Sequence, residues 1–386
     1  MDISYIINHL GEERKNYEGS VNPPIFQTSN FAVSTVEELR YKVSHEFESP
    51  FYTRGNNPTT TILRKKIAAL EGTEDALIFS SGSAAIAAAV MNVVKNGDHV
   101  VCVQKPYGWT NYLLNHLLVQ YGVTTTMIDG RDPENFRNAI QPNTKLFFLE
   151  TPNTMTFELQ DIQKVCEMAS EHKILTILDN SYSSPLFQQP AALGVDIVCH
   201  SATKYFSGHS DIVGGIVCST TERIKSIFKS EFMCLGANIS PHDAAAILKG
   251  LRTLPIRLEQ SARTASKVAF FLEYHNKVKK IHWPYANSFP QKELAKTQMK
   301  NCGGLMSIEL DVEDFSGVEK FCNSLKHFLI ATSWGGFESL VFPICAFSAD
   351  KKSHAHHLPW NLVRIYIGLE DAELLISDLD QALEKI

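Results

Sequence analysis

The feature that most constrains the fold is a series of short apolar runs between residues 76 and 219 that alternate with helix-like stretches. An alanine-rich helix is expected at 83–94, and helical spacing of apolar residues recurs at 161–172. Continuous apolar runs are typical of strands in a parallel sheet that is buried on both faces. The pattern therefore predicts an α/β domain with a mostly parallel sheet. The expected strands lie within ALIFSSG (76–82), HVVCVQ (99–104), KLFFLE (145–150), LTILDN (175–180), DIVCHS (196–201) and GGIVCS (214–219).

The pattern changes after about residue 240. Residues 244–275 predict one long helical stretch that is interrupted at Pro255. Strands are expected at GGLMSIEL (303–310) and VRIYIGLE (363–370), and the C-terminal tail predicts an amphipathic helix with Asp371 as its N-cap. This second part is expected to form a smaller α+β unit.

A chain of 386 residues is long enough for two or three domains. Residues 1–54 are polar and have no clear periodicity, so we expect them to form an irregular arm rather than a domain. We place the α/β domain at 55–240 and the α+β domain at 241–386.

Composition and charge exclude several classes of function. The net charge of −6 argues against nucleic-acid binding, and no apolar run is long enough to span a bilayer. The N-terminus lacks a basic segment followed by an apolar core, so no secretory leader is expected. The eight cysteines form no C-x-x-C pair, which favours a reduced, cytoplasmic location. The histidine cluster at 353–357 has no obvious acidic or thiol partner and predicts a solvated loop, so no metal is expected.

Several chemistry-bearing residues lie where expected strands end, which is where ligands bind in open α/β sheets. Ser81-Gly82-Ser83 stands between a strand and a helix, and free N–H groups at a helix N-terminus favour an anion such as phosphate. The glycine there has an equally good steric explanation. Asp179 ends an apolar strand and suits a cationic partner such as a protonated ring nitrogen, although a loop hydrogen bond would also satisfy it.

The segment SATKYFSGHSDIVGG (201–215) carries Ser201, Thr203 and Lys204. Two hydroxyl groups at this spacing suit phosphate oxygens, and a desolvated lysine is a better nucleophile because its pKa falls. A solvated loop lysine is the alternative, which the position of Asp179 about 25 residues earlier disfavours.

Two further residues stand out for their positions. Tyr107 follows the strand expected at 99–104, where its ring could stack on a flat cofactor or pack as an ordinary loop tyrosine. Arg364 lies within an apolar strand, and its planar guanidinium suits a carboxylate, either of a substrate or of an internal salt bridge.

These residues closely resemble a known family. SATKYFSGHSDIVGG is similar to the lysine motif of the pyridoxal-phosphate enzymes of cysteine and methionine metabolism, the transsulfuration family, which have the fold of aspartate aminotransferase. The resemblance covers nearly the whole chain. The matching segments, in order, are VNPPIFQTS, YTRGNNPTT, ALEGTEDALIFSSGSAAI, NTKLFFLETP, ILDNSYSSP, LKGLRTLPIRL, SWGGFESL and VRIYIGLED. It implies a fold type I enzyme with a seven-stranded, mostly parallel sheet.

The resemblance implies pyridoxal 5′-phosphate as the cofactor. Lys204 resembles the lysine that bonds the cofactor aldehyde, and Asp179 resembles the partner of the ring nitrogen. Tyr107 resembles the tyrosine that stacks on the ring and helps to move protons. The residues that resemble the phosphate ligands are Gly82, Ser83, Ser201 and Thr203.

Other positions concern the substrate and neighbouring subunits. Tyr52 and Arg54 resemble a pair that reaches the phosphate of a neighbouring subunit, which implies a homotetramer built from two dimers. Arg364 and Ser333 resemble the site for the substrate carboxylate, and Trp334 is expected to be a substrate-binding residue beside them. The expected partner is a small amino-acid thioether.

The reaction within the family is predicted from two segments. Trp334 in ATSWGGFESL resembles the S-W-G-G run of bacterial cystathionine β-lyases, and ETPNTMTFELQDI resembles their pattern with Thr156 and Glu158. Many γ-acting relatives carry a glutamate at the position of Thr332. The resemblance therefore favours β-elimination of cystathionine or a related cysteine thioether, giving homocysteine, pyruvate and ammonia as part of methionine biosynthesis. However, Thr332 also replaces the tyrosine of the β-lyases, and YTRGNNPTT is typical of the wider family.

Alternative functions remain at this point. Within the family they are γ-elimination and γ-replacement, represented by cystathionine γ-lyase, cystathionine γ-synthase and O-acetylhomoserine sulfhydrylase. A nicotinamide oxidoreductase is disfavoured because no G-x-G-x-x-G follows the first expected strand. A catalytically silent homologue is disfavoured by the intact set of Lys204, Asp179 and Arg364.

Overall fold

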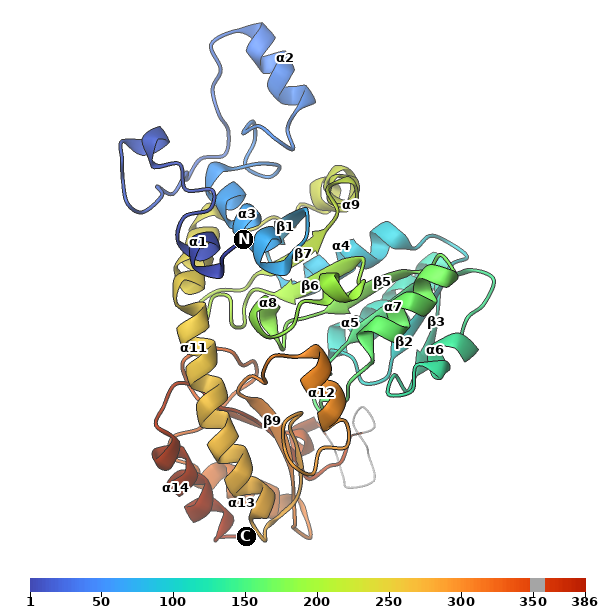
Figure 1. Cartoon of the computed structure of the whole chain (residues 1–386), viewed down its shortest axis with the longest axis vertical. Coiled ribbons are helices and arrows are strands. Elements are labelled where there is room, and N and C mark those ends of the chain that lie inside the picture. The colour runs from blue at the N-terminus through green and yellow to red at the C-terminus, as the bar shows by residue number, and fades with distance from the viewer. Residues whose placement is uncertain (348–357) are drawn as a thin grey trace.

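The computed structural model describes residues 1–347 and 358–386, and the histidine cluster at 353–357 lies outside these residues. Its centre is a seven-stranded sheet in the order β1-β7-β6-β5-β4-β2-β3 (Figure 1). Strand β7 runs antiparallel to both of its neighbours, and the remaining pairs are parallel. The strands are β1 (Asp75–Phe79), β2 (His99–Val103), β3 (Thr124–Ile128), β4 (Thr144–Glu150), β5 (Leu175–Asp179), β6 (Ile197–Ser201) and β7 (Gly215–Ser219).

The expected parallel sheet is therefore confirmed, and each apolar run identified above contains one of its strands. Strand β3 was not among the expected strands. It lies at the edge of the sheet, and its sequence TTTMI has polar residues where an interior strand would be apolar.

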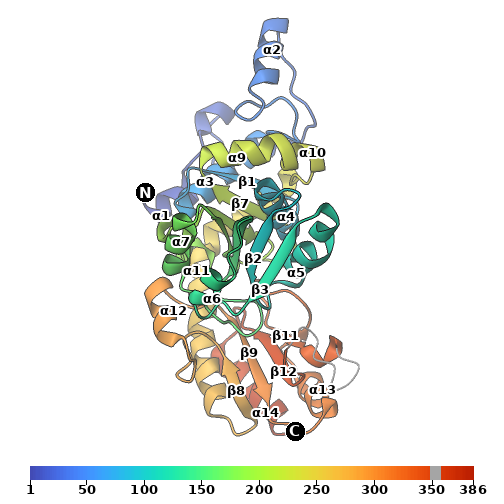
Figure 2. The same cartoon turned by 90° about the vertical axis from the view of Figure 1, so that its right-hand side faces the viewer.

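Helices cover both faces of this sheet. Apolar residues of α4 pack with β1, β6 and β7 on one face, whereas those of α3 and α7 pack on the other (Figure 2). The first ten helices are α1 (Ile3–Asn8), α2 (Val36–Ser44), α3 (Pro58–Glu71), α4 (Gly82–Val93), α5 (Gly108–Tyr112), α6 (Glu134–Asn138), α7 (Ile162–Glu171), α8 (Ser184–Phe187), α9 (Thr221–Ile227) and α10 (Met233–Leu235). Short 3₁₀ and π turns lie at Arg14–Tyr17, Leu113–Leu117, Leu118–Tyr121, Pro190–Leu193, Phe228–Phe232 and Ile344–Phe347.

The second part of the chain builds a five-stranded sheet in the order β10-β11-β12-β9-β8. The long helix α11 (Pro241–Tyr274) runs beside both sheets in Figure 1. It continues through Pro255, so the expected interruption at this residue was wrong. The side chain of Asp371 accepts hydrogen bonds from the N–H groups of Glu373 and Leu374, which confirms it as the N-cap of the last helix. The remaining elements are β8 (Val278–His282), β9 (Leu305–Leu310), β10 (Leu329–Ile330), β11 (Leu340–Pro343), β12 (Leu362–Tyr366), α12 (Lys292–Gln298), α13 (Phe315–Ser324) and α14 (Ala372–Leu383).

The N-terminal segment is less irregular than we expected. Helix α1 carries Ile6 and Ile7, which are buried against the body of the molecule. The ammonium group of the buried Lys66 donates hydrogen bonds to the carbonyl oxygens of both residues, at 2.9 and 2.8 Å. Helix α2 projects away from the body in Figure 1 and has no buried residue. The domain boundaries at residues 54 and 240 stay a prediction.

None of the described helices combines the length and the apolar character that a membrane span requires. The described residues also contain no group of three or more His, Cys, Asp or Glu side chains that could hold a metal ion.

Candidate active site

Two carboxylates end neighbouring parallel strands. Glu150 is the last residue of β4, Asp179 is the last residue of β5, and the two are paired in register. Asp179 Oδ1 accepts hydrogen bonds from the backbone N–H and the hydroxyl group of Ser181, at 2.9 and 2.6 Å. The Ser181 hydroxyl oxygen in turn accepts the N–H of Ser201 at 2.7 Å. This chain links the ends of β5 and β6.

Glu150 is a site residue that we did not identify from the sequence. Its Oε2 atom accepts the N–H of Tyr107 at 2.6 Å. Burial, together with the neighbouring charge of Asp179, raises the pKa of Glu150 to about 8. Burial also raises the pKa of Asp179, although the hydrogen bonds from Ser181 oppose that shift. The sequence does hold a signal for Glu150, because it ends the run KLFFLE just as Asp179 ends LTILD.

The N-terminus of helix α4 faces the end of β6. Ser81 is its N-cap, and its hydroxyl oxygen accepts the N–H of Ala84 at 3.1 Å. A Cβ atom on Gly82 would lie 3.0 Å from Cβ of Ser201, so the absence of a side chain permits this close approach. The first N–H groups of a helix have no partner within the helix, and the hydroxyls of Ser83 and Ser201 donate no hydrogen bond to another described residue.

Thr203 differs from these two serines. Its hydroxyl group donates to the carbonyl oxygen of Gly214 at 3.3 Å and accepts the N–H of the same glycine at 3.0 Å. The side chain of Thr203 therefore closes the loop that follows β6. To bind a phosphate, its hydroxyl group would have to exchange its hydrogen bond to Gly214 for one to the ligand.

Lys204 lies between the two parts of the molecule. Its Nζ atom donates a hydrogen bond of 2.5 Å to Oγ of Ser333, which comes from the segment between β10 and β11. Burial is the main cause that lowers the pKa of Lys204 to about 8, and the charge of Arg364 adds to it, whereas Asp179 opposes it. A large share of Lys204 is therefore uncharged just above neutral pH.

The segment around Ser333 has an unusual backbone. Ser333 has a φ of 78° and Gly335 a φ of 87°, both in the left-handed region. A Cβ atom on Gly335 would lie 2.8 Å from the backbone nitrogen of Tyr205 and 2.9 Å from Cα of Lys204. Only glycine lets this segment lie directly against the backbone of the lysine.

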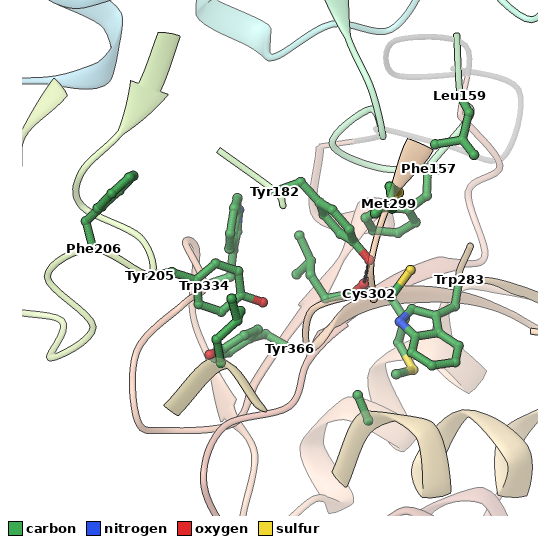
Figure 3. Close-up of a cluster of buried hydrophobic side chains, with 14 of the residues drawn as sticks. Phe157, Leu159, Tyr182, Tyr205, Phe206, Trp283, Met299, Cys302, Trp334 and Tyr366 are labelled. Atoms are coloured by element: carbon green, nitrogen blue, oxygen red, sulfur yellow. Dashed lines mark hydrogen bonds between the residues drawn. The ribbon is translucent and has the colours of Figure 1, made fainter. Parts of the chain in front are cut away.

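Trp334 belongs to a cluster of buried hydrophobic side chains that includes Tyr182, Tyr205 and Tyr366 (Figure 3). Its ring lies 5.4 Å from that of Tyr205 and 6.4 Å from that of Tyr182, in tilted or edge-on arrangements. The ammonium group of Lys204 lies 5.4 Å from the Trp334 ring centroid. The cluster therefore braces the lysine segment against the C-terminal part of the chain.

Arg364 lies in the middle of β12 and is only 8% exposed. Within residues 1–347 and 358–386 it forms no ion pair with a carboxylate within 4 Å, so the internal salt bridge is not found there. Its Nη1 atom donates to the carbonyl and hydroxyl oxygens of Thr154 at 3.5 and 3.4 Å. Burial lowers the pKa of Arg364 to about 10, which the charge of Glu150 opposes. A buried guanidinium without a carboxylate is suited to bind one from outside.

The comparisons with known proteins agree on the family. Residues 5–384 match the family model of Cys/Met metabolism PLP-dependent enzymes. The chain belongs to this family. It is 40% identical to an L-methionine gamma-lyase of Treponema denticola, over 98% of this chain and 96% of the relative. It is 35% identical to a cystathionine beta-lyase of Lactococcus lactis subsp. cremoris, over 98% and 97%. The crystal structure of metB from Corynebacterium glutamicum superposes with a TM-score of 0.93 at 35% identity, over 100% of this chain and 98% of that one.

Membership confirms the fold type I architecture and pyridoxal phosphate as the cofactor of this enzyme. The arrangement of side chains also fits that cofactor. An amine with a lowered pKa, a carboxylate at a strand end and a helix N-terminus with two available hydroxyls converge within one region. These groups match the aldehyde, the ring nitrogen and the phosphate of the cofactor, respectively.

Two expected residues, Tyr52 and Arg54, form no hydrogen bond, ion pair or ring contact with this cluster in the described chain, and a third, Tyr107, reaches it only through its backbone. Tyr52 and Arg54 are exposed, and their closest ring contact is with each other, at 5.5 Å. Tyr107 is held by its backbone to Glu150, but the residue is 38% exposed and its ring stacks on no described aromatic ring. A single chain therefore brings together the lysine, carboxylate, helix and arginine, but not the arm residues.

Proposed function

We propose that this enzyme is a carbon–sulfur lyase that removes a thiol from Cβ of an amino-acid thioether such as cystathionine. The observation that carries the proposal is the position of Lys204. Its amine donates a hydrogen bond to Ser333. Burial and the charge of Arg364 lower the pKa of this amine, whereas the charge of Asp179 raises it. An amino acid whose carboxylate binds Arg364 would present its Cα–H bond near an amine that is able to accept the proton.

The residues that would hold the cofactor follow from the geometry above. Asp179 would face the ring nitrogen, Tyr107 would stack on the ring, and Lys204 would bond the aldehyde. Bound pyridoxal phosphate supplies an electron-withdrawing ring that acidifies Cα of an amino acid joined to it. The residues proposed at the phosphate are Gly82, Ser83, Ser201 and Thr203.

Lys204 is proposed as the group that moves the proton. With a pKa of about 8, roughly a tenth of the amine is uncharged at pH 7, far more than for an ordinary lysine with a pKa near 10.4. Loss of the Cα proton drives the departure of the thiolate from Cβ. Addition of one water to the remaining fragment gives pyruvate and ammonia, so the thioether and water together become a thiol, pyruvate and ammonia.

Arg364 and Ser333 are proposed to orient the substrate. The guanidinium would hold the carboxylate through two N–H donors, a geometry that lysine does not offer. Trp334 would face the lysine rather than bind the substrate directly, since it is buried in the hydrophobic cluster.

The proposal of cleavage at Cβ rests on Trp334 and its neighbours, which resemble the S-W-G-G run of bacterial cystathionine β-lyases. Thr332 has no charge to hold the distal ammonium group of a substrate such as cystathionine, so it does not by itself separate cleavage at Cβ from cleavage at Cγ. One observation favours γ-elimination as the second candidate, because the sequence is 40% identical to a methionine gamma-lyase. Both reactions use the same lysine and arginine.

The assembly and location are also proposals. Exposed Tyr52 and Arg54 on the projecting arm support a second copy of the chain that receives them at its phosphate site, within a tetramer of two dimers. All eight cysteines are free, which supports a cytoplasmic location.

Identification of the keto acid tests this proposal. The cofactor-loaded enzyme is incubated with L-cystathionine and, separately, with L-methionine. Pyruvate and homocysteine from cystathionine support β-elimination, whereas 2-oxobutyrate from either substrate supports γ-elimination. No keto acid from either thioether would contradict the lyase proposal.

A further inference from the structure

Within residues 1–347 and 358–386, the hydrogen bonds of the Arg364 guanidinium all go to one turn. Its Nη1 atom meets two oxygens of Thr154 at 3.4 and 3.5 Å and the sulfur of Met155 at 3.6 Å. All three acceptors are uncharged, and a thioether sulfur is a weak one. Because these bonds are long, small shifts of the turn would change where the guanidinium points.

Asn153 gives the turn its shape. Its side-chain oxygen accepts the backbone N–H groups of Met155, Thr156 and Phe157, at 3.3, 3.0 and 2.8 Å. Phe157 is buried and has a φ of 56°, which is costly for a bulky residue. The amide of Asn153 therefore has to be held in place for the turn to keep this strained conformation.

Glu158 holds that amide. Its Oε2 atom accepts the side-chain N–H of Asn153 at 3.2 Å, and its backbone oxygen accepts the backbone N–H of Asn153 at 3.2 Å. Its Oε1 atom forms an ion pair of 3.0 Å with Nζ of Lys105. The two charged side chains are 23% and 24% exposed, so the pair is only partly screened by water.

Lys105 connects this network to the segment that follows strand β2 and carries Tyr107. It has a φ of 56° and follows strand β2, two residues before Tyr107. The backbone of Tyr107 is fixed by Glu150. One ion pair thus joins the segment of Tyr107 to the turn that contacts Arg364.

We propose that Lys105, Glu158 and Asn153 form a positioning network that holds Thr154 and Met155 against Arg364. The network thereby sets the affinity of the site for the α-carboxylate of the substrate. None of the three residues touches the reacting atoms. The proposal rests on the proposed role of Arg364, and it adds the residues that tune it.

The test uses Glu158→Gln and Lys105→Met, each as the cofactor-loaded enzyme. Removing the ion pair should raise KM for the thioether about 5- to 20-fold and change kcat less than about 2-fold, because the lost contact with the carboxylate is equally strong in the ground state and in the transition state. Lys105→Arg keeps the charge and should restore most of the wild-type KM. Glu293→Gln, which breaks the exposed 2.8 Å pair with Lys296 on α12, should leave KM unchanged.

A binding measurement separates this proposal from the lyase proposal. L-norleucine has no leaving group, and n-pentylamine is its counterpart without the carboxylate, so their dissociation constants are measured from the change in cofactor absorbance. Glu158→Gln should raise the dissociation constant of norleucine at least 5-fold and that of pentylamine less than 2-fold. An equal rise in both dissociation constants, or no rise for norleucine, would overturn the proposal of a positioning network. This comparison stands even if no thioether yields a keto acid.

Discussion

Glu150 and Asp179 end adjacent parallel strands and face one another in register, so two buried carboxyl groups share one edge of the sheet. Two like charges this close in a dry site favour a state in which one of them keeps a proton. The raised pKa of Glu150, about 8, is in accord with a proton on that residue at neutral pH.

The first prediction concerns Glu150→Gln, which keeps an oxygen for the N–H of Tyr107 but has no ionisable proton. The pKa of Glu150 is higher in the folded state than in the unfolded state, so the folded state binds more protons between about pH 4.5 and 8. Wild-type stability therefore falls as the pH rises through this window, and the variant should not show that fall. We expect the cofactor-free variant to be more stable at pH 8 by on the order of 2 kcal/mol.

Denaturant unfolding of both proteins at pH 5, 6.5 and 8 measures this difference. The gap should shrink toward pH 5, because this pH is close to the unfolded-state pKa of Glu150 and little of the proton-linked loss of stability has yet built up there. A gap that is constant with pH would show that Glu150 does not titrate in this range.

The second prediction concerns Lys204→Met. Without the amine, turnover should fall at least about 10³-fold, because both the bond to the cofactor and the proton acceptor are lost. The same variant should be more stable as the cofactor-free protein, since it removes a buried amine whose pKa is lowered by burial. We expect a gain of about 1–3 kcal/mol below pH 8.

The pH dependence identifies the cause of that gain. Between about pH 8 and 10.5 the unfolded lysine is charged and the folded one is not, so wild-type stability rises with pH and the gap closes. Chemical unfolding at pH 7 and pH 9.5 checks this, and turnover near the wild-type rate would refute the role of Lys204.

The third prediction concerns Gly335→Ala. The added Cβ would collide with the backbone at Lys204 and Tyr205, and the φ of 87° disfavours alanine in addition. The free energy of unfolding should fall by about 2–4 kcal/mol, and activity should fall about 10-fold or more as Ser333 moves away from the lysine.

Gly97→Ala is the matched control for this variant. Gly97 has a φ of 90° but no atom within 4 Å of an added Cβ, so it carries the backbone cost alone. Equal destabilisation in the two variants by thermal unfolding would exclude the close approach as the cause.

The fourth prediction concerns Arg364→Met. KM for the thioether should rise about 100-fold or more, because the carboxylate loses the buried guanidinium that is proposed to bind it. Stability should not fall, since a buried cation without an acidic partner is replaced by an apolar side chain. Arg364→Lys should retain part of the affinity, and an unchanged KM in both variants would contradict the assignment.

The sequence alone determined most strands of the main sheet and the positions of the candidate site residues. Long apolar runs identified six strands because their burial on both faces leaves no room for polar residues. Asp179 and Arg364 stood out because charged groups among apolar residues need a partner, and Lys204 stood out because the hydroxyl residues Ser201 and Thr203 accompany it. Strands β3, β8, β10 and β11 were missed. Exposed or polar positions interrupt the apolar pattern in β3, β8 and β10, and β11 has only four residues.

The tertiary structure decided what those positions do together. The bond between Lys204 and Ser333 joins residues 129 positions apart, and it forms only because Gly335 lets two backbones touch. The pairing of Glu150 with Asp179 depends on strand order and register, which the sequence of either strand does not specify. Local pattern thus placed the charged groups along the chain, whereas packing between distant segments set their distances, and with them their pKa values and partners.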